Sequence, residues 1–364
     1  MSSRELECGC AVCGGLAAGC KHCIRGSAMV LFVTGRCNTG CFFCPVSSEK
    51  MGKDVMYANE GCVTTDDEII AEAEAMDATA TGITGGDPSG DMDRTLHMIR
   101  LLKGHFGKKH HIHMYTSIID PDKAEALEKA GLDEIRYHPR ESLWCSMDST
   151  FLKKIIDSSK MDIGIELPVL PDYSDSLAHI IEWACSNGID FINLNELEFS
   201  ESNWNMMESH GYKPKDDISS AVKGSEELAI ALMKKYPDAP IHFCSSSFKD
   251  GVQLRRRLIR RAENSAEEYC VITEDGTVIK GIVYTDDLMA VAEFMKSEYD
   301  VPDILMKADA DRGVLEIAPW ILEEIGKNLP YKCYIVEEYP TEDRLEVERT
   351  PVNRGPFRRP ISLR

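Results

Sequence analysis

Between residues 29 and 245, short apolar runs alternate with segments whose apolar residues recur at helical spacing. The first run, Met29–Thr34, is continuous, as is typical of a strand buried on both faces of a parallel sheet. Further strands are expected at 79–84, 110–116, 133–138, 162–169, 189–197 and 240–245. Helical patterns are found at 66–77, 92–104, 121–130, 148–158, 175–187 and 225–236. This alternation predicts right-handed βαβ units in an α/β fold, a partial or full (β/α) barrel whose chemistry lies at the carboxyl ends of the strands.

The pattern differs on either side of this barrel. The preceding residues are rich in Cys and Gly, and the following ones begin with an arginine-rich helix and then a β-hairpin signal at Glu274-Asp275-Gly276. We therefore expect five segments: metal-binding knuckles at 1–28, the barrel at 29–247, a connecting helix at 248–267, a small α+β domain at 268–348 and a basic tail at 349–364. Because the barrel carries the chemical motifs, the small domain is expected to select the substrate.

The charge of the chain limits its partners. The net charge is −20, and because the tail holds five arginines and no acidic residue, the rest of the chain carries −25. Such a surface disfavours a broad nucleic-acid interface, although the tail and the arginines at 255–261 could hold a phosphate or an acidic partner. No apolar run is long enough to span a membrane, and the first residues lack the apolar core of a signal peptide. A cytoplasmic location is expected.

Eight of the 14 cysteines lie between Cys8 and Cys44, and such clustering in a reducing cytosol favours metal binding over disulfides. Two Cys-x2-Cys pairs, Cys10 with Cys13 and Cys20 with Cys23, supply four thiols, which is the usual number for a closed structural zinc site. A rubredoxin-like mononuclear iron, an auxiliary iron–sulfur cluster and unligated thiols remain alternatives. The spacing assigns no role to Cys8 or Cys244.

Three more thiols follow the first strand, where Cys37, Cys41 and Cys44 are separated by three and by two residues. A loop with these gaps can place each sulfur on a different iron of a [4Fe–4S] cubane, and it leaves the fourth iron without a protein ligand. That iron can chelate a small molecule through an amino and a carboxylate group. Zinc is the competing interpretation, but a structural zinc site is normally closed by four ligands.

With Phe43 directly before its last cysteine, this motif resembles that of the radical S-adenosylmethionine (SAM) superfamily. A second motif, Gly85-Gly86-Asp87-Pro88, resembles the glycine-rich segment that receives the SAM amino group, although Glu is more common where this chain has Asp87. The resemblance covers about residues 29–245 and implies a radical SAM barrel with Phe43 close to the adenine. It also implies the first reaction step, in which the reduced cluster cleaves SAM to methionine and a 5′-deoxyadenosyl radical that abstracts a hydrogen atom.

More narrowly, the chain resembles an uncharacterised, mainly archaeal family related to pyruvate formate-lyase activating enzymes. The likeness lies in Val30–Gly35, Lys53–Glu60 and His242–Asp250. It implies an oxidoreductase or modification enzyme that takes an electron from a donor such as ferredoxin or flavodoxin. It does not fix the substrate, for which a protein glycyl centre is one class. An RNA base-modifying enzyme and a non-enzymatic iron–sulfur or zinc scaffold are the alternatives.

Polar residues near the ends of the later strands are candidates for contacts with SAM. Glu166 and Asn195 are preferred, because carboxylate and amide groups can bind ribose hydroxyls and an amine. Other polar residues lie at comparable positions: Thr116, Ser117, His138, Asn193, Glu196 and Glu198. The alternative for all of them is a polar barrel interior held together by structural hydrogen bonds. The sequence assigns no catalytic residue.

Overall fold

The computed structural model describes residues 4–353 of the 364-residue chain. The chain divides into two compact units with the boundary between Leu254 and Arg255, and we call them unit 1 and unit 2. The segment up to residue 28, which was expected as separate metal knuckles, belongs to unit 1. No helix of the described residues is long and apolar enough to cross a membrane.

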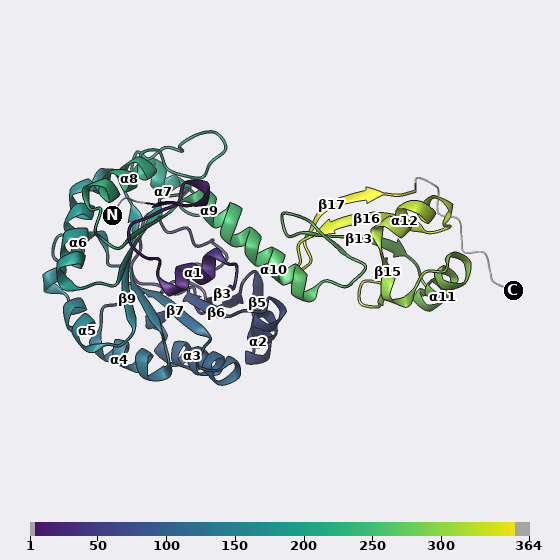
Figure 1. Cartoon of the computed structure of the whole chain (residues 1–364), viewed down its shortest axis with the longest axis horizontal. Coiled ribbons are helices and arrows are strands. Elements are labelled where there is room, and N and C mark those ends of the chain that lie inside the picture. Colours follow the sequence, from purple (N-terminus) through teal and green to yellow (C-terminus); the bar gives the residue numbers. More distant parts are fainter. Residues whose placement is uncertain (1–3, 354–364) are drawn as a thin grey trace. The chain divides into compact units, whose positions relative to one another are not determined.

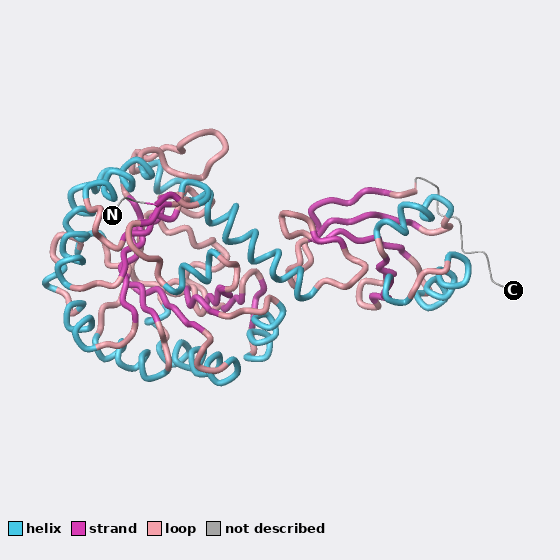
Figure 2. The backbone as a smooth tube through the Cα atoms, in the orientation of Figure 1, coloured by secondary structure: helices cyan, strands magenta, loops and turns pink. Residues whose placement is uncertain are grey.

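Unit 1 is built on one large curved sheet (Figure 2). Seven neighbouring strands pair in parallel: β3 (Ala28–Phe32), β6 (Ala80–Thr84), β7 (His111–Thr116), β8 (Glu134–Tyr137), β9 (Asp162–Val169), β10 (Phe191–Glu196) and β11 (Ile241–Cys244). They are the seven strands that the alternation predicts, in chain order, so the α/β prediction is confirmed.

Short antiparallel strands extend both edges of this sheet. Beyond β3 lie β4 (Met56–Ala58) and β5 (Gly61–Val63), and beyond β11 lie β2 (Ala11–Val12) and β1 (Arg4–Glu5). These four strands have two or three residues each, too few for a periodicity to reveal them. Because the strand order runs from β1 to β5, the sheet is open and forms a partial barrel.

Helices cover the convex side of the sheet (Figure 1). They are α2 (Asp66–Ala75), α3 (Met92–Phe106), α4 (Pro121–Ala130), α5 (Leu152–Ser158), α6 (Ser174–Asn187) and α8 (Ser225–Lys235), while a further helix, α7 (Trp204–Ser209), lies between β10 and α8 in the chain. Local chemistry fixes their ends: Thr65 and Glu68 form a capping box at α2, and Asp120 caps α4, which ends at the left-handed Gly131. The main apolar core, with Ile83 and Ile163, lies between strands and helices.

One helix, α1 (Ala18–Ile24), lies on the other side of the sheet, inside its curve (Figure 1). It contacts β3, β6 and β7. A Cβ atom on Gly19 would lie 2.6 Å from Nη2 of Arg136 and 2.7 Å from Nδ1 of His113, so a larger residue would displace these buried side chains. The helix therefore brings Cys20 and Cys23 into the interior of the barrel.

Short helical turns occur throughout the chain, at Glu7–Gly9, Pro88–Gly90, Glu141–Leu143, Met147–Ser149, Pro171–Tyr173, Asp303–Leu305 and Gly326–Asn328. The continuous arginine-rich helix expected from residue 248 is instead three consecutive pieces: α9 (Ser246–Phe248), a π-helical turn at Lys249–Leu254, and α10 (Arg255–Ser265). The boundary between the two units falls at the end of the π-helical turn.

Unit 2 contains an antiparallel sheet in the order β14 (Met306–Asp309), β15 (Val314–Ile317), β13 (Val278–Tyr284), β16 (Lys332–Glu338) and β17 (Glu346–Pro351), and β12 (Val271–Ile272) pairs with β13. The helices α11 (Leu288–Tyr299) and α12 (Pro319–Ile325) supply Val291, Met295 and Leu322 to its apolar core. The predicted hairpin is β12–β13. The basic tail was expected from residue 349, but β17 includes Arg349; residues 354–364 lie outside the described part.

Candidate functional site

A cavity of about 620 Å³ lies inside the curve of the sheet in unit 1. The loops that follow β3 and β6 form part of its wall, together with residues at the carboxyl ends of β7 to β11. This is where active sites of (β/α) folds are found. The cavity brings together all three cysteines of the Cys37–Cys44 loop, Phe43, the Gly85–Asp87 segment, Glu166 and Asn195.

The three thiols of the loop after β3 lie at different depths. Cys37 is exposed and its sulfur is 2.7 Å from the Thr39 hydroxyl, whereas Cys41 and Cys44 are half-buried. Burial raises the pKa of the Cys41 and Cys44 thiols, so a bound cation would be needed to hold them as thiolates. Among the described residues, these three sulfur atoms do not form a group in which all ligand atoms lie within 4.8 Å of one another. Such separation suits a cluster, whose ligands bind different iron atoms, and the donor set fits a [4Fe–4S] group.

The glycine-rich segment after β6 is bonded directly to the start of the cysteine loop. The Gly86 amide donates to the Thr34 carbonyl at 2.6 Å, and the Asp87 amide donates to the Arg36 carbonyl at 3.0 Å. A Cβ atom on Gly86 would lie 2.3 Å from the Arg36 carbonyl oxygen. Glycine is therefore needed here for the close approach of two backbones, one of which leads straight into Cys37.

The side chain of Asp87 fastens the neighbouring loop. Its carboxylate accepts hydrogen bonds from the Thr116 hydroxyl at 2.7 Å, and from the Ser117 amide and hydroxyl at 2.9 and 2.5 Å. It also accepts from the Ser89 amide at 3.0 Å. The Asp87 carboxylate thus ties the loop after β6 to the end of β7 and keeps the glycine-rich segment in position.

Phe43 and His138 pack against each other in the cavity wall. Their ring centroids are 5.9 Å apart, and the Asn203 amide group donates to the Phe43 carbonyl at 3.0 Å. Burial lowers the pKa of His138, which favours the neutral imidazole. Its Nδ1 lies 2.9 Å from the Glu166 carbonyl oxygen and must therefore be the protonated nitrogen that donates. Both rings are held rigidly beside the cysteine loop.

The two preferred candidates from the later strands, Glu166 and Asn195, are hydrogen-bonded to each other. The Asn195 amide group donates to Oε1 of Glu166 at 2.6 Å, and the Asn193 amide group donates to Oε2 at 2.8 Å. The parallel pairing of β9 with β10 places Glu166 opposite Asn193 and so produces this contact. Glu166 and Asn195 remain predictions as SAM contacts.

Sequence reasoning missed Arg136, a lining residue that is only 2% exposed. Its guanidinium group lies 2.6 Å from Glu134 and 3.6 Å from Glu166, and it donates to the Tyr115 hydroxyl at 2.9 Å. Burial opposes the charge on Glu134, but Arg136 outweighs it and holds the pKa of that carboxyl well below its usual range. A signal was present, because β8 (Glu134–Tyr137) carries an acidic and a basic residue two positions apart, on one face of a strand within a parallel sheet.

The four thiols expected to form a closed zinc site are not brought together. Because Ala11 and Val12 form strand β2, residues three apart point to opposite faces of the sheet. Cys13 joins the core between sheet and helices, whereas Cys10 packs with Cys244 inside the barrel. The sulfur atoms of Cys10 and Cys244 and a ring nitrogen of His242 lie within 4.8 Å of one another. The four-thiol ligand set remains a prediction that the observed arrangement does not favour.

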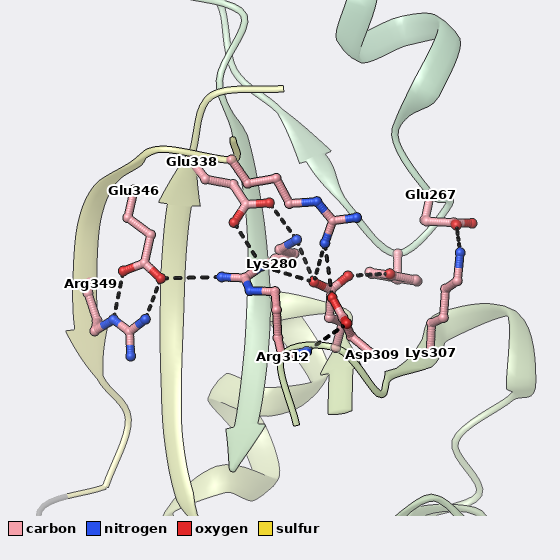
Figure 3. A network of polar contacts seen from close by, with 11 residues as sticks. Glu267, Lys280, Lys307, Asp309, Arg312, Glu338, Glu346 and Arg349 are labelled. Carbon is pink, nitrogen blue, oxygen red and sulfur yellow. Dashed lines mark hydrogen bonds and ion pairs between the residues drawn. The ribbon is translucent and has the colours of Figure 1, made fainter. Parts of the chain in front are cut away.

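Unit 2 has a polar centre of its own (Figure 3). Residues of this centre line a cavity of about 820 Å³. The Lys280 ammonium group lies 2.6 Å from Glu316 and 2.5 Å from Glu338, and all three residues are buried. Arg312 contacts both glutamates at 3.4 and 3.3 Å. These contacts join β13, β15 and β16 on one face of the sheet.

Comparisons with known proteins agree with the barrel motifs. The sequence matches the radical SAM superfamily over residues 31–139 and a domain of unknown function, DUF8061, over residues 276–352. It is 38% identical over 356 residues to a protein of Methanocaldococcus jannaschii named "Putative glycyl-radical enzyme activating enzyme", with 93% of each chain covered.

Partial similarity to solved structures was found at low sequence identity. SuiB of Streptococcus suis, bound to its precursor peptide SuiA, is 12% identical with a TM-score of 0.40, over 60% of this chain and 48% of SuiB. The chain thus spans about half the length of SuiB. The protein anSMEcpe with bound AdoMet is 13% identical with a TM-score of 0.38, over 68% of this chain and 72% of that one.

The matched region runs from the end of β3 through β6, β7 and β8 and contains both motif loops, and the identity to the M. jannaschii protein extends over nearly the whole of each chain. The chain belongs to the radical SAM superfamily, in one family with that archaeal protein, and is a radical SAM enzyme.

Proposed function

We propose that this enzyme cleaves SAM reductively and uses the resulting radical to abstract a hydrogen atom from a glycine residue of a partner protein. The observation that carries the proposal is the direct bonding of two motif loops at the cavity wall. The backbone around Gly86 and Asp87 is hydrogen-bonded to the residues that lead into Cys37. The name of the M. jannaschii relative supports the choice of a glycyl-radical partner.

Each motif has a distinct task in this proposal. Cys37, Cys41 and Cys44 would hold a [4Fe–4S] cluster, which when bound supplies one electron to SAM and so generates methionine and a 5′-deoxyadenosyl radical. The Gly85–Gly86 backbone would hold the methionyl group of SAM. Asp87 keeps this segment in place through Thr116 and Ser117.

The remaining lining residues would orient the nucleoside and exclude water. Phe43 offers an apolar ring edge to the adenine, and Glu166 with Asn195 offers acceptors and donors to the ribose hydroxyls. The cavity of about 620 Å³ lies within the range of small-molecule sites. Because Cys37 is exposed, an electron donor such as ferredoxin or flavodoxin could approach the cluster from its side of the loop.

We further propose that unit 2 selects the partner protein. It contains the region that matches a domain in its own right, and its charged centre lies beside a large cavity. Charged groups set specificity more readily than they add affinity. The barrel then performs one reaction while unit 2 determines the protein on which it acts.

The experiment is anaerobic incubation of the reconstituted, reduced enzyme with SAM and a purified glycyl-radical enzyme. We expect about one 5′-deoxyadenosine per radical formed and a glycyl signal in the electron paramagnetic resonance (EPR) spectrum. The matched control is the same partner with its radical-bearing glycine changed to alanine, which should show no such signal. Formation of 5′-deoxyadenosine without any glycyl radical, on every such partner tested, would refute the glycyl assignment and leave SAM cleavage standing.

A further inference from the structure

The last strand of the barrel and the added strand β2 present three metal-binding side chains to one side. In β11, Ile241 and Phe243 join the core between sheet and helices, so His242 and Cys244 point to the barrel interior. Strand β2 pairs antiparallel with β11, Val12 opposite His242 and Ala11 opposite Phe243. Continued by one residue, this register sets Cys10 opposite Cys244.

The three ligand atoms are close enough to share one ion. The Cys10 and Cys244 sulfurs and one His242 nitrogen all lie within 4.8 Å of one another, and all three residues are buried. Nε2 of His242 is 3.8 Å from the Cys10 sulfur. Two thiolates and an imidazole form a ligand set that zinc accepts readily, with a water or substrate in the fourth position.

A chain of hydrogen bonds fixes the histidine in the form that a metal requires. Glu166 accepts from the Asn193 amide nitrogen at 2.8 Å, which orients that amide so that its oxygen faces His242. The Asn193 oxygen lies 3.3 Å from Nδ1 of His242 and can accept its proton. Nε2 is then the nitrogen with a free lone pair, on the side of Cys10. Metal-ligating histidines are typically held by such an outer hydrogen bond.

The fourth position is not supplied by a cysteine. Cys20 lies beside the group and its side chain also interacts with His242, but its sulfur is held by the Arg136 guanidinium at 3.4 Å and the Asn193 amide nitrogen at 3.5 Å. It does not belong to the set of atoms within 4.8 Å. His242 and Cys244 both line the cavity that also contains the Cys37–Cys44 loop.

We propose that Cys10, His242 and Cys244 bind one zinc ion whose fourth coordination position opens into the SAM cavity. In the resting enzyme that position would hold water. A thiolate, carboxylate or imidazole of the substrate could displace the water and be held within the same cavity as the radical source. The zinc content does not depend on the proposed function, so the two can fail separately.

The test is the zinc, iron and sulfide content of the full-length enzyme, purified anaerobically from medium that contains zinc and iron. We expect about one zinc per chain in addition to the cluster. Cys10→Ser, His242→Ala and Cys244→Ser should each reduce bound zinc at least tenfold and leave the iron of the Cys37–Cys44 cluster in place. Asn193→Leu should weaken zinc affinity about ten- to hundredfold, because it removes only the outer hydrogen bond.

Cys13→Ser, Cys20→Ser and Cys23→Ser are the matched controls and should keep their zinc. Loss of zinc in Cys13→Ser or Cys23→Ser would establish the four-thiol site instead, and loss in Cys20→Ser would refute the open position. Absence of zinc from the unaltered enzyme, or additional iron and sulfide that depend on Cys10 and Cys244, would overturn the proposal.

A measurement on the unaltered chain covers the case in which a variant fails to fold. Cysteine alkylation is mapped by mass spectrometry before and after treatment with a zinc chelator. Chelation should increase the labelling of Cys10 and Cys244 and leave that of Cys13 and Cys62 unchanged. Equal labelling of Cys10 before and after chelation, or a disulfide between Cys10 and Cys244, would contradict zinc binding.

Discussion

Each unit buries a cluster of charged residues, but the two clusters are built differently. In unit 1, Arg136 is flanked by Glu134 and Glu166, and the neighbouring positions are occupied by amides and thiols that line the cavity. In unit 2, Lys280 faces Glu316 and Glu338, and Arg312 contacts the same two glutamates (Figure 3). The first cluster depends on one cation and the second on several. In unit 1 the polar groups around Arg136 face a cavity and can meet a ligand, whereas in unit 2 two cations and two carboxylates contact one another.

The largest effect should come from removing the three thiols of the loop after β3 in unit 1. Changing Cys37, Cys41 and Cys44 together to Ala should abolish SAM cleavage, because the proposed cluster would then lose all three of its thiolate ligands. The measurement is 5′-deoxyadenosine by liquid chromatography under reducing, anaerobic conditions. Cys145→Ala, at an exposed position of the same unit, is the control and should retain full activity. Cleavage that persisted in the triple variant would contradict the assignment.

The next effect concerns the contact between the two motif loops. Gly86→Val should weaken SAM binding more than tenfold and should also lower the iron content, since its side chain would meet the Arg36 backbone. Sequence reasoning alone predicts a loss of SAM binding with an intact cluster, and the structure changes that expectation. Gly90→Val is the matched control, because a Cβ atom there meets nothing within 4 Å. Titration with SAM and analysis of iron content would distinguish loss of SAM binding alone from loss of both SAM binding and iron. An unchanged iron content in Gly86→Val would support the expectation from sequence, in which the cluster stays intact.

The two charged clusters can be compared directly by removing the central cation of each. Arg136→Met should cost unit 1 about 3–5 kcal/mol, because it leaves the buried Glu134 and the half-buried Glu166 without the cation that they share. Lys280→Met should cost unit 2 roughly 2 kcal/mol, because Arg312 still contacts both glutamates. Hydrogen exchange resolved by mass spectrometry would follow each unit separately in the full chain. Equal losses in the two units would show that the clusters are energetically alike.

The smallest expected effect is a difference between the two units in how their stability depends on pH. All ten histidines precede residue 243, so unit 2 has none. Burial lowers the pKa of His110 from 6.5 to about 4. As the pH falls, His110 therefore takes up a proton in the unfolded chain before it does so in the folded one. The contribution of the neutral, buried His110 to the free energy of unfolding is complete above pH 6.5 and is lost as the pH falls through about 4. It amounts to roughly 3 kcal/mol.

Exchange protection of unit 1 should therefore fall between pH 6.5 and 4 while that of unit 2 changes less. His110→Gln, which keeps a polar partner for the Thr81 hydroxyl, should reduce the pH dependence. A decline of the same size in both units over this range would assign the effect to carboxylates instead.

Local periodicity was sufficient for the parts of the fold that it governs. The helix expected at 121–130 is α4, and the strand expected at 162–169 is β9, because long elements with caps and apolar runs carry their own signal. The triplet of cysteines and the glycine-rich segment were also recognisable, since each motif lies within one loop. Both loops line the same cavity because β3 and β6 are paired in parallel.

The rest depended on contacts between distant parts of the chain. Whether Cys10 and Cys13 face the same side depends on a two-residue strand, and the pairing of that strand with β11 joins residues about 230 positions apart. Arg136 is buried in the barrel, and its importance becomes apparent only when Glu166 and Cys20 are seen beside it. The position of α1 inside the barrel follows from the fit of Gly19 against β7 and β8. A pattern within one segment contains none of this information.

The pairing of β2 with β11 also sets an order of events during synthesis of the chain. Cys10 leaves the ribosome early, yet its neighbour His242 follows 232 residues later. At about 5–20 residues per second that interval is on the order of 10–50 s, during which the first cysteines cannot reach their final neighbours. Contacts this distant in sequence form late in folding. Until then Cys10 is accessible to any passing metal or oxidant, so the cell's supply of metal during translation bears on how the nascent enzyme matures.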